Sequence, residues 1–312
     1  MKNVEIKLTV FTPTYNRADL LMRGYEALKR QTCKDFEWLI VDDGSTDNTE
    51  ELVQKKILPE NEFKVRYIKK ANGGLHTGYN TAIENINTEL CTCVDSDDYL
   101  ADDAVEKILA FWEEYGLDKV AGIVAPNCDL DGKVIGTFLP NQKTINLIDL
   151  MAGKYKGIYG DRINIVRTDL YKEVAPVPTF EGEKFFNPHW LHLKICQKYD
   201  FLVCNDCLRV VDYQPAGMSN SMLRQYYNSP NSFREIRRLY LQFKNVPLKF
   251  VVKNCIHFSS SCFLAKKAKG IFKSPRPVLT FLLCPFGFAL SRYIKSKIKK
   301  GQANSSFTKV KD

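Results

Sequence analysis

Three carboxylates crowd into the run Asp95-Ser96-Asp97-Asp98, directly after the apolar stretch 90–94. Carboxylates this close repel one another, so they add no stability at the end of an apolar strand. A divalent cation removes that repulsion, and oxygen ligands together with substrate phosphates suit Mg²⁺ or Mn²⁺. The run therefore predicts a metal and diphosphate site. The alternative, that Asp97 or Asp98 caps the next helix, explains one carboxylate but not three.

Three further polar segments have residue types that suit a nucleotide. Asp42-Asp43-Gly44-Ser45 either forms a turn with a helix cap, or offers a carboxylate to a ring N–H of a base. Thr12-Pro13-Thr14-Tyr15-Asn16 is either a strand-to-helix corner or a loop whose Tyr15 stacks on a base and whose backbone N–H groups face phosphate. Asn72-Gly73-Gly74 is glycine-rich at the start of a helix that contains His76 and Asn80, which favours anion binding.

The elements that must position these residues alternate between strand and helix. Apolar, β-rich runs predict strands at 7–12, 36–41, 65–68, 90–94 and 120–125. Helical spacing predicts helices over 17–30, from Thr46 or Asp47 to Ile57, and over 75–86 and 102–115. This alternation predicts an α/β fold with a mostly parallel central sheet and helices on both faces. Ligands bind such sheets at the carboxyl ends of the strands, so the polar segments are expected to converge on one edge.

The pattern changes after residue 127. A hairpin turn is expected at 129–133, strands at 158–166 and 201–213, and a helix at 185–199. Residues 232–312 lose the alternation and contain the apolar run 277–290, in which Pro285 and Gly287 disfavour one continuous helix.

Charge is distributed unevenly along the 312 residues. The formal net charge is +9, yet the stretch from Ser232 onward holds 18 Lys and Arg against 2 Asp and Glu, while the residues before it hold 27 against 34. Such a basic tail suits an anionic membrane surface. Nucleic acid is not expected as a partner, because the tail lacks aromatic–basic alternation.

The ten cysteines are expected to be reduced thiols in a cytoplasmic protein, because no secretory signal precedes the first strand. Cys204 and Cys207 have a CxxC spacing, but no second pair completes a zinc site.

Taken together, four segments resemble the successive motifs of family 2 glycosyltransferases with the GT-A fold: 10–17, 40–47, 72–80 and 94–98. The resemblance is strong over about 7–127 and moderate over 155–215. It implies that Thr14, Tyr15 and Asp43 hold the base, that Asp95 meets the ribose or metal, and that Asp97 and Asp98 carry metal and diphosphate. By the same resemblance the other donor-site residues are Thr12, Pro13, Asn16, Asp42, Asn72, Gly73, Gly74, Asn80 and Ser96.

The family also has an acidic residue in its acceptor half. Glu183 matches the position that resembles the catalytic base, with Glu181 as the fallback. The alternative for Glu183 is a first-turn carboxylate that the helix dipole favours. The stretch 212–219 resembles the family's mobile loop over the donor.

These observations lead to an expected function and organisation. The expected activity is transfer of a sugar from a nucleotide-sugar, a UDP-sugar, to an acceptor hydroxyl with inversion, in bacterial surface polysaccharide or glycan assembly. A nucleotidyltransferase and a non-catalytic sugar-nucleotide-binding protein are the alternatives. Residues 1–231 are expected to be catalytic, with a nucleotide-sugar half at 1–127 and an acceptor half at 128–231.

Residues 232–312 are expected to be a helical tail that anchors the enzyme peripherally on the inner face of the cell membrane, near a lipid-linked acceptor. The alternative is a helical hairpin buried against the catalytic part.

Overall fold

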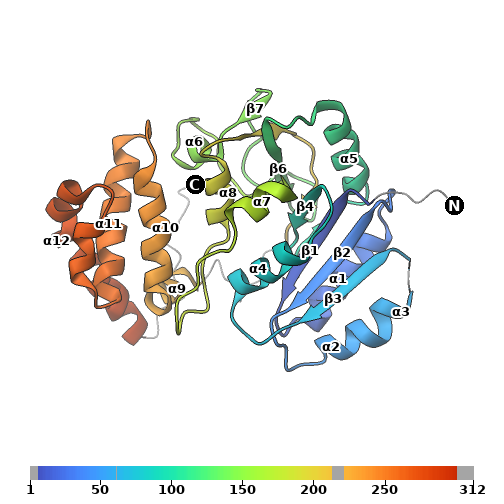
Figure 1. Ribbon diagram of the computed structural model, residues 1–312, viewed down its shortest axis with the longest axis horizontal. Coiled ribbons are helices and arrows are strands. Elements are labelled where there is room, and N and C mark those ends of the chain that lie inside the picture. Colours follow the sequence, from blue (N-terminus) through green and yellow to red (C-terminus); the bar gives the residue numbers. More distant parts are fainter. Residues whose placement is uncertain (1–5, 61, 213–220, 301–312) are drawn as a thin grey trace. The chain divides into compact units, whose positions relative to one another are not determined.

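The computed structural model describes residues 6–60, 62–212 and 221–300 (Figure 1). The chain forms two compact units. The first comprises 1–177 and 191–212, and the second comprises 178–190 and 213–312. In this division, 178–190 and the described residues 221–231 group with the residues from Ser232 onward.

The first unit is built on one mixed sheet. Its strands follow the order β3-β2-β1-β4-β8-β6-β10-β5, with β9 pairing with β6 and β7. The strands are β1 Leu8–Thr14, β2 Phe36–Asp42, β3 Lys64–Lys69, β4 Leu90–Cys93, β5 Tyr99–Leu100, β6 Val120–Cys128, β7 Thr144–Ile145, β8 Arg162–Arg167, β9 Asp200–Val203 and β10 Arg209–Val210. Strands β3, β2, β1 and β4 are parallel, and β8 runs antiparallel to both β4 and β6. The expected mostly parallel sheet is confirmed.

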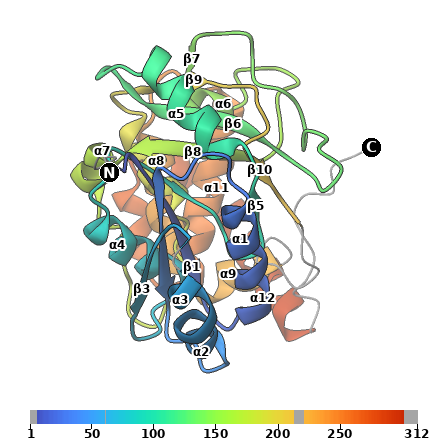
Figure 2. The same cartoon turned by 90° about the vertical axis from the view of Figure 1, so that its right-hand side faces the viewer.

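Helices cover both faces of this sheet, as Figure 2 shows for α1 and α4 around β1 and β3. The helices before β6 are α1 Ala18–Lys29, α2 Thr49–Leu52, the π-turn η1 Val53–Ile57, α3 Leu58–Glu60, α4 Leu75–Asn85 and α5 Ala104–Tyr115. Side chains alternate along β1, so Val10 belongs to the core that includes Leu21 and Tyr25 of α1, while Phe11 contacts Tyr79 of α4 edge to face at 5.1 Å. Consecutive residues of β1 therefore pack against helices on opposite faces of the sheet.

The later part of the sheet departs from the expected elements. The stretch 201–213 holds two short strands, β9 and β10, because Cys204 to Leu208 forms a loop between them. The helix expected over 185–199 is confined to α8 His189–Ile195. The hairpin turn at 129–133 is confirmed by the hydrogen bond from the N–H of Asp129 to the carbonyl of Lys133, at 2.9 Å. Two short helices were not anticipated, α6 Leu147–Met151 and α7 Thr168–Val174.

The second unit contains a bundle of helices, in which Figure 1 shows α10, α11 and α12 side by side. Its helices are α9 Met222–Asn228, α10 Pro230–Gln242, α11 Leu248–Leu264, the 3-10 helix η3 Ala268–Lys273 and α12 Pro277–Lys299. Among the described residues, α12 is the one helix long and apolar enough to cross a membrane, and 22% of its apolar window is buried.

The expectation that Pro285 and Gly287 break this segment is wrong, because α12 is continuous through both. Packing against α11 offsets the hydrogen bond that Pro285 lacks. Gly287 lies close to α11, where an added Cβ atom would lie 2.0 Å from Oγ of Ser259.

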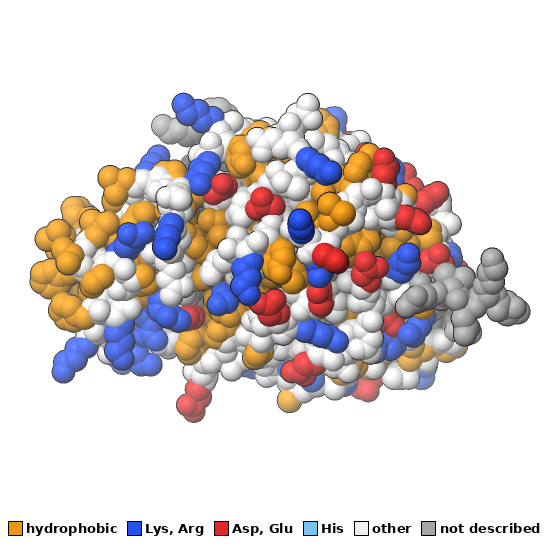
Figure 3. Space-filling model, turned by 45° about the horizontal axis from the view of Figure 1, so that its top comes forward, with side chains coloured by type: hydrophobic (Ala, Val, Ile, Leu, Met, Phe, Trp, Pro, Cys, Tyr) orange, Lys and Arg blue, Asp and Glu red, His pale blue; other side chains and the backbone are white. Residues whose placement is uncertain are grey.

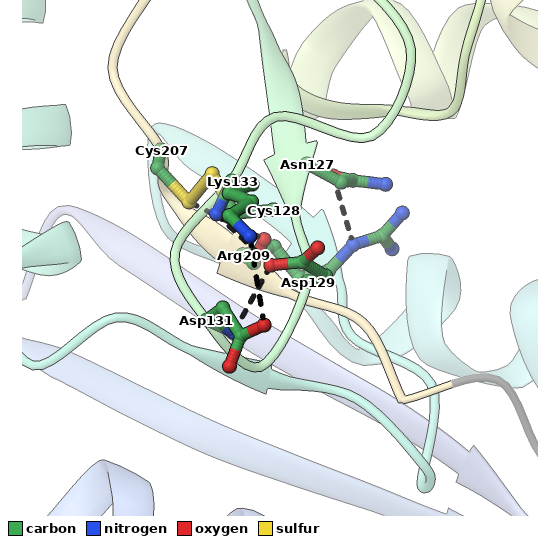
Figure 4. Close-up of a disulfide and its surroundings, with 7 residues drawn as sticks. All are labelled: Asn127, Cys128, Asp129, Asp131, Lys133, Cys207 and Arg209. Atoms are coloured by element: carbon green, nitrogen blue, oxygen red, sulfur yellow. Dashed lines mark hydrogen bonds and ion pairs between the residues drawn. A yellow bond between two sulfur atoms is a disulfide. The ribbon is translucent and has the colours of Figure 1, made fainter.

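The expectation that all ten cysteines are thiols is also wrong. Cys128 and Cys207 form a disulfide (Figure 4), and the other eight cysteines are free. The parallel pairing of β10 with the end of β6 brings the two together, because it places Val210 opposite Cys128. The CxxC spacing therefore does not mark a pair, since Cys207 is bonded to a residue 79 positions away.

Candidate donor-binding site

The loops that follow β1 and β2 are joined by Asn16. Its side-chain carbonyl accepts hydrogen bonds from the N–H groups of Thr46 at 2.8 Å and Asp47 at 3.3 Å, and its own N–H donates to Oγ of Ser45 at 2.9 Å. Asn16 has a φ of 52°, a left-handed conformation that asparagine tolerates better than most residues. Asn16 thus fixes the corner after β1 against the turn after β2.

Asp43 organises the glycine-rich loop. Its carboxylate accepts hydrogen bonds from Lys70 Nζ at 2.7 Å, from Thr77 Oγ1 at 3.3 Å, and from three groups of the loop: Nδ2 of Asn72 at 3.2 Å and the N–H groups of Gly73 at 2.9 Å and Gly74 at 2.7 Å. These contacts use most of the acceptor capacity of one carboxylate. Asp43 therefore shapes the loop in which the sequence predicts anion binding.

Asp42 is fully buried and has a separate set of partners. It accepts from the N–H of Ser45 at 2.7 Å and from the hydroxyl of Tyr67 at 2.6 Å. These two bonds hold the turn after β2 on the neighbouring strand β3. Both carboxylates of the pair thus have defined structural partners.

The acidic cluster is bounded by two arginines. Arg17 forms an ion pair with Asp97 at 2.8 Å, and Arg209 of β10 lies 3.7 Å from Asp98. Burial, together with the neighbouring carboxylates, raises the pKa of Asp98 to about 7, although Arg209 opposes this shift. Burial likewise raises the pKa of Asp95. The two guanidinium groups therefore compensate only part of the negative charge in the cluster.

The carboxylate oxygens of this cluster are suitable ligands for a divalent cation. Oxygen ligands are what Mg²⁺ and Mn²⁺ prefer, and in the described part of the chain the three carboxylates have only two neighbouring guanidinium groups, those of Arg17 and Arg209. Within the described residues, however, no three His, Cys, Asp or Glu side chains are grouped as a ready-made metal site. A bound ion would therefore have to take ligands from the nucleotide as well as from the protein.

The remaining predicted donor residues lie in two places. Thr12 and Thr14 are buried in β1; the Thr12 hydroxyl accepts from Trp38 Nε1 at 3.0 Å, and the Thr14 hydroxyl has no hydrogen-bond partner in the described part of the chain. The side chain of Tyr15 is 46% exposed, as a base-stacking residue requires. Asn80 is held elsewhere, since both ends of its amide bond the backbone of Val177, at 2.8 and 3.0 Å.

Pro13 and Ser96 complete the set. Pro13 lies against Gly78, where an added Cβ would come within 3.1 Å of the proline ring, so α4 packs close to the corner after β1. Ser96 is buried, and its hydroxyl lies 3.5 Å from Arg17. The structure thus brings 12–16, 42–47, 72–74 and 95–98 to the carboxyl ends of β1, β2 and β4, as the sequence predicts, while Asn80 points to other contacts.

Glu183 belongs to the second unit. It is buried, and its carboxylate accepts four hydrogen bonds of 2.6 to 2.8 Å from the backbone and side chains of Asn231 and Ser232, at the start of α10. A carboxylate in this position satisfies N–H groups that have no partner within the helix. Glu183 therefore has a structural role, because it links the 178–190 segment to the start of α10.

Three basic residues were missed as site residues: Arg17, Lys70 and Arg209. Arg17 is the last residue of the segment 10–17, and Lys70 comes just before the glycine-rich segment. Arg209 carries the clearest signal, because a charged residue inside the apolar run 208–211 needs a buried partner. It also donates to Oδ1 of Asn127 at 3.2 Å, as Figure 4 shows.

The fold has solved counterparts. A TarS fragment from S. aureus in complex with UDP-GlcNAc aligns with 95% of this chain and 92% of its own, with a TM-score of 0.62 and 19% identity. The mannosyltransferase PcManGT from Pyrobaculum calidifontis, in complex with GDP-Man and Mn²⁺, aligns with 95% of this chain and 84% of its own, with a TM-score of 0.56 and 16% identity. The fold is therefore GT-A-like, as the sequence predicts.

Sequence comparison gives the family. Residues 9–153 match the family model described as Glycosyl transferase family 2. The chain is 34% identical over 119 residues to the glycosyltransferase GlyA of Streptococcus pneumoniae, and 37% identical over 131 residues to the chondroitin synthase of Pasteurella multocida. These alignments cover 38% and 41% of this chain, but only 17% and 13% of the two relatives. Residues 9–153 are thus a family 2 glycosyltransferase region, which confirms the resemblance stated from the sequence.

Proposed function

We propose that this chain transfers a sugar from a UDP-sugar to an acceptor hydroxyl with inversion, in the assembly of a bacterial surface polysaccharide or other glycan. The observation that carries the proposal is the Asp95-to-Asp98 cluster, short of positive charge and adjoining the loops after β1 and β2. The complex of TarS with UDP-GlcNAc and the relative named as a chondroitin synthase support this choice of donor and product.

Each part of the proposed site has a defined task. The corner 12–16 and the loop that Asp43 organises receive the nucleoside, with Tyr15 stacking on the base. Asp97 and Asp98 would hold Mn²⁺ or Mg²⁺, which when bound supplies positive charge for the leaving diphosphate, and Asp95 meets the ribose or the metal. Arg17, which pairs with Asp97 at 2.8 Å, would lose part of this interaction if Asp97 held a cation, and its guanidinium would then be available to phosphate.

Glu183 is proposed as the base that accepts the proton of the acceptor hydroxyl, while that hydroxyl attacks the anomeric carbon opposite the diphosphate. Its four hydrogen bonds orient the carboxylate but fill the acceptor sites of both oxygens, so at least one of these bonds must open before Glu183 takes the proton. A single base without a second nucleophilic carboxylate implies one displacement and hence inversion.

Product analysis separates this proposal from its alternatives. Phosphorus NMR of a reaction with a UDP-sugar, Mn²⁺ and a glycan acceptor should show UDP accumulating. A nucleotidyltransferase, acting on sugar phosphate and UTP, would release pyrophosphate instead. A binding protein would leave the donor unchanged while it shifts the donor's resonances. Either of these two outcomes would refute the proposal.

A further inference from the structure

Part of α12 has a polarity reversed relative to a helix of a water-soluble bundle, although Leu279, Leu283 and Leu290 pack inward on the hydrophobic clusters of this unit. Its fully buried positions are mostly small or polar: Thr280, Gly287, Ser291 and Ile294. Its largest apolar side chains point outward, and together with Phe272 of η3 they are between 51% and 74% exposed; this outer face consists of Phe272, Val278, Phe281, Leu282, Phe286 and Phe288. A helix that packs on a core in water normally buries such side chains.

The packing of α12 on α11 explains this reversal. The facing surface of α11 includes Cys255 and Ser259, both buried. The hydroxyl of Thr280 lies 3.4 Å from Sγ of Cys255, and the missing side chain at Gly287 leaves room for Ser259. Small residues let two helix backbones approach closely, which is how helices pair where lipid, not water, surrounds them. The bulky apolar side chains of α12 are thereby left on the outside.

A groove extends the outer face toward the start of α11. It has a volume of about 510 Å³ and lies between the first turns of α11 and α12, where its lining includes Phe243, Leu248, Val251, Arg276 and Val278. Leu248 on one wall is 71% exposed and Val278 on the other is 74% exposed. Arg276 donates to the carbonyls of Leu241 and Phe243 at 3.3 Å, which holds its guanidinium beside the groove. A mostly apolar groove with a guanidinium in its lining suits an acyl chain below a phosphate headgroup.

Charge identifies the partner of this surface. The sequence has no Asp or Glu between Glu235 and Asp312, and the outer face is bracketed by Lys273 and Arg276 at one end and by Arg292 and Lys295 at the other. Figure 3 shows hydrophobic side chains gathered where α11 and α12 lie, with Lys and Arg beside them. A second copy of the chain would bring two equally basic surfaces together. An anionic lipid surface satisfies both the charges and the apolar side chains.

We propose that the outer face of α12 docks into the interface of an anionic bilayer, with α12 lying along the membrane and the groove at its start taking a lipid chain. Although the whole of α12 has the length and composition of a span, its uncharged stretch from Pro277 to Ser291 has only about fifteen residues, where a span needs about twenty, so we place the helix along the bilayer and not across it. The outer face is followed along α12 by Arg292 and Tyr293, residue types that favour the headgroup region. This docking is independent of the proposed sugar transfer.

The test is co-sedimentation of the full-length protein with vesicles. One set contains phosphatidylglycerol in phosphatidylcholine, and the other contains phosphatidylcholine alone. The variant Phe281→Ser/Phe286→Ser removes two exposed aromatic side chains from the outer face and leaves the buried contacts of α12 in place. Leu130→Ser/Phe138→Ser is the matched control, since it removes two equally exposed apolar side chains far from α12 in sequence.

We expect the wild type and the control to sediment with anionic vesicles at low salt, and the α12 variant to lose at least about tenfold in partitioning. Added salt should release the wild type, because exposed charges are screened. The proposal is overturned if the wild type ignores anionic vesicles, if it binds both vesicle types equally, or if the two double variants bind alike. A concentration-dependent dimer that only the α12 variant abolishes, without vesicle binding, would also overturn it, in favour of self-association.

Thermal unfolding checks that each variant is folded. Because the substituted side chains are exposed, both double variants are expected to melt at the wild-type temperature. Vesicle binding needs neither donor nor acceptor. Its failure would therefore leave the proposed transfer reaction untouched, and failure of transfer would leave the docking untouched.

Discussion

Glu183→Gln separates the two roles of the buried carboxylate. In the structure the carboxylate accepts four hydrogen bonds from Asn231 and Ser232. A glutamine keeps one oxygen, while its NH₂ group would face donors that the lost oxygen had satisfied. Losing about two charge-assisted hydrogen bonds predicts a fall of roughly 3–6 kcal/mol in the free energy of unfolding. As a base, the same residue predicts a fall in kcat of about 10² or more, with donor affinity retained.

Two control variants distinguish these effects. Ser232→Ala removes one hydrogen bond from the carboxylate, so about 1 kcal/mol of stability is expected to be lost while the base remains. Glu181→Gln changes an exposed carboxylate in the same segment and is expected to affect neither quantity strongly. Urea unfolding gives the stabilities, and transfer rates are measured at a temperature where every variant is folded.

Two outcomes would contradict the roles assigned to Glu183. If Glu183→Gln transfers sugar at more than about a tenth of the wild-type rate, the base lies elsewhere and Glu181 is the next candidate. If Glu183→Gln leaves the unfolding free energy unchanged, the four hydrogen bonds do not stabilise the start of α10 as argued.

Three other predictions follow from the site and its surroundings. Asp97→Asn is expected to abolish transfer and to weaken metal-dependent binding of the donor, which calorimetry with and without Mn²⁺ would measure; near-wild-type turnover would rule out the metal role. Because burial raises the pKa of Asp98 from 3.8 to about 7, the metal-free folded protein binds a proton that the unfolded chain releases, so its stability should fall as pH rises between these values. Melting temperatures across that range should show less of this fall in Asp98→Asn, and an identical profile would contradict the assignment. Thiol titration of denatured protein purified without reductant should find eight of the ten cysteines free, whereas ten would exclude the bond between Cys128 and Cys207.

Much of the region from β1 to β4 could be predicted from sequence because its signals are local. Strands β1 and β2 are runs of buried apolar residues that end at polar turns, and both were predicted within two residues of their observed ends. Parallel pairing then brings the loop after Thr14 beside the loop after Asp42, without further information. The segments after β4 and β3 join them through the parallel pairing of β1 with β4 and of β2 with β3.

Features that depend on long-range contacts could not be read in the same way. Strand β10 has two residues and is defined by pairing with β6 and β5, so no periodicity marks it. The partners of Glu183 lie 48 and 49 positions further along the chain, and its first-turn environment belongs to α10, not to the helix that follows it in sequence. The continuity of α12 through Pro285 likewise reflects packing on α11, which overrides the local preference.

The central claim is that this chain is a nucleotide-sugar-dependent transferase whose acidic cluster acts through a divalent cation. Release of nucleoside diphosphate from a panel of nucleotide-sugars, with Mn²⁺ or with chelator, tests that claim most directly in wild type and in Asp97→Asn. The account predicts release from at least one UDP-sugar by the wild type with Mn²⁺, and loss of that release both in chelator and in the variant. Release that persists unchanged in chelator and in Asp97→Asn would contradict it, as would the absence of release from every donor in the presence of acceptor glycans.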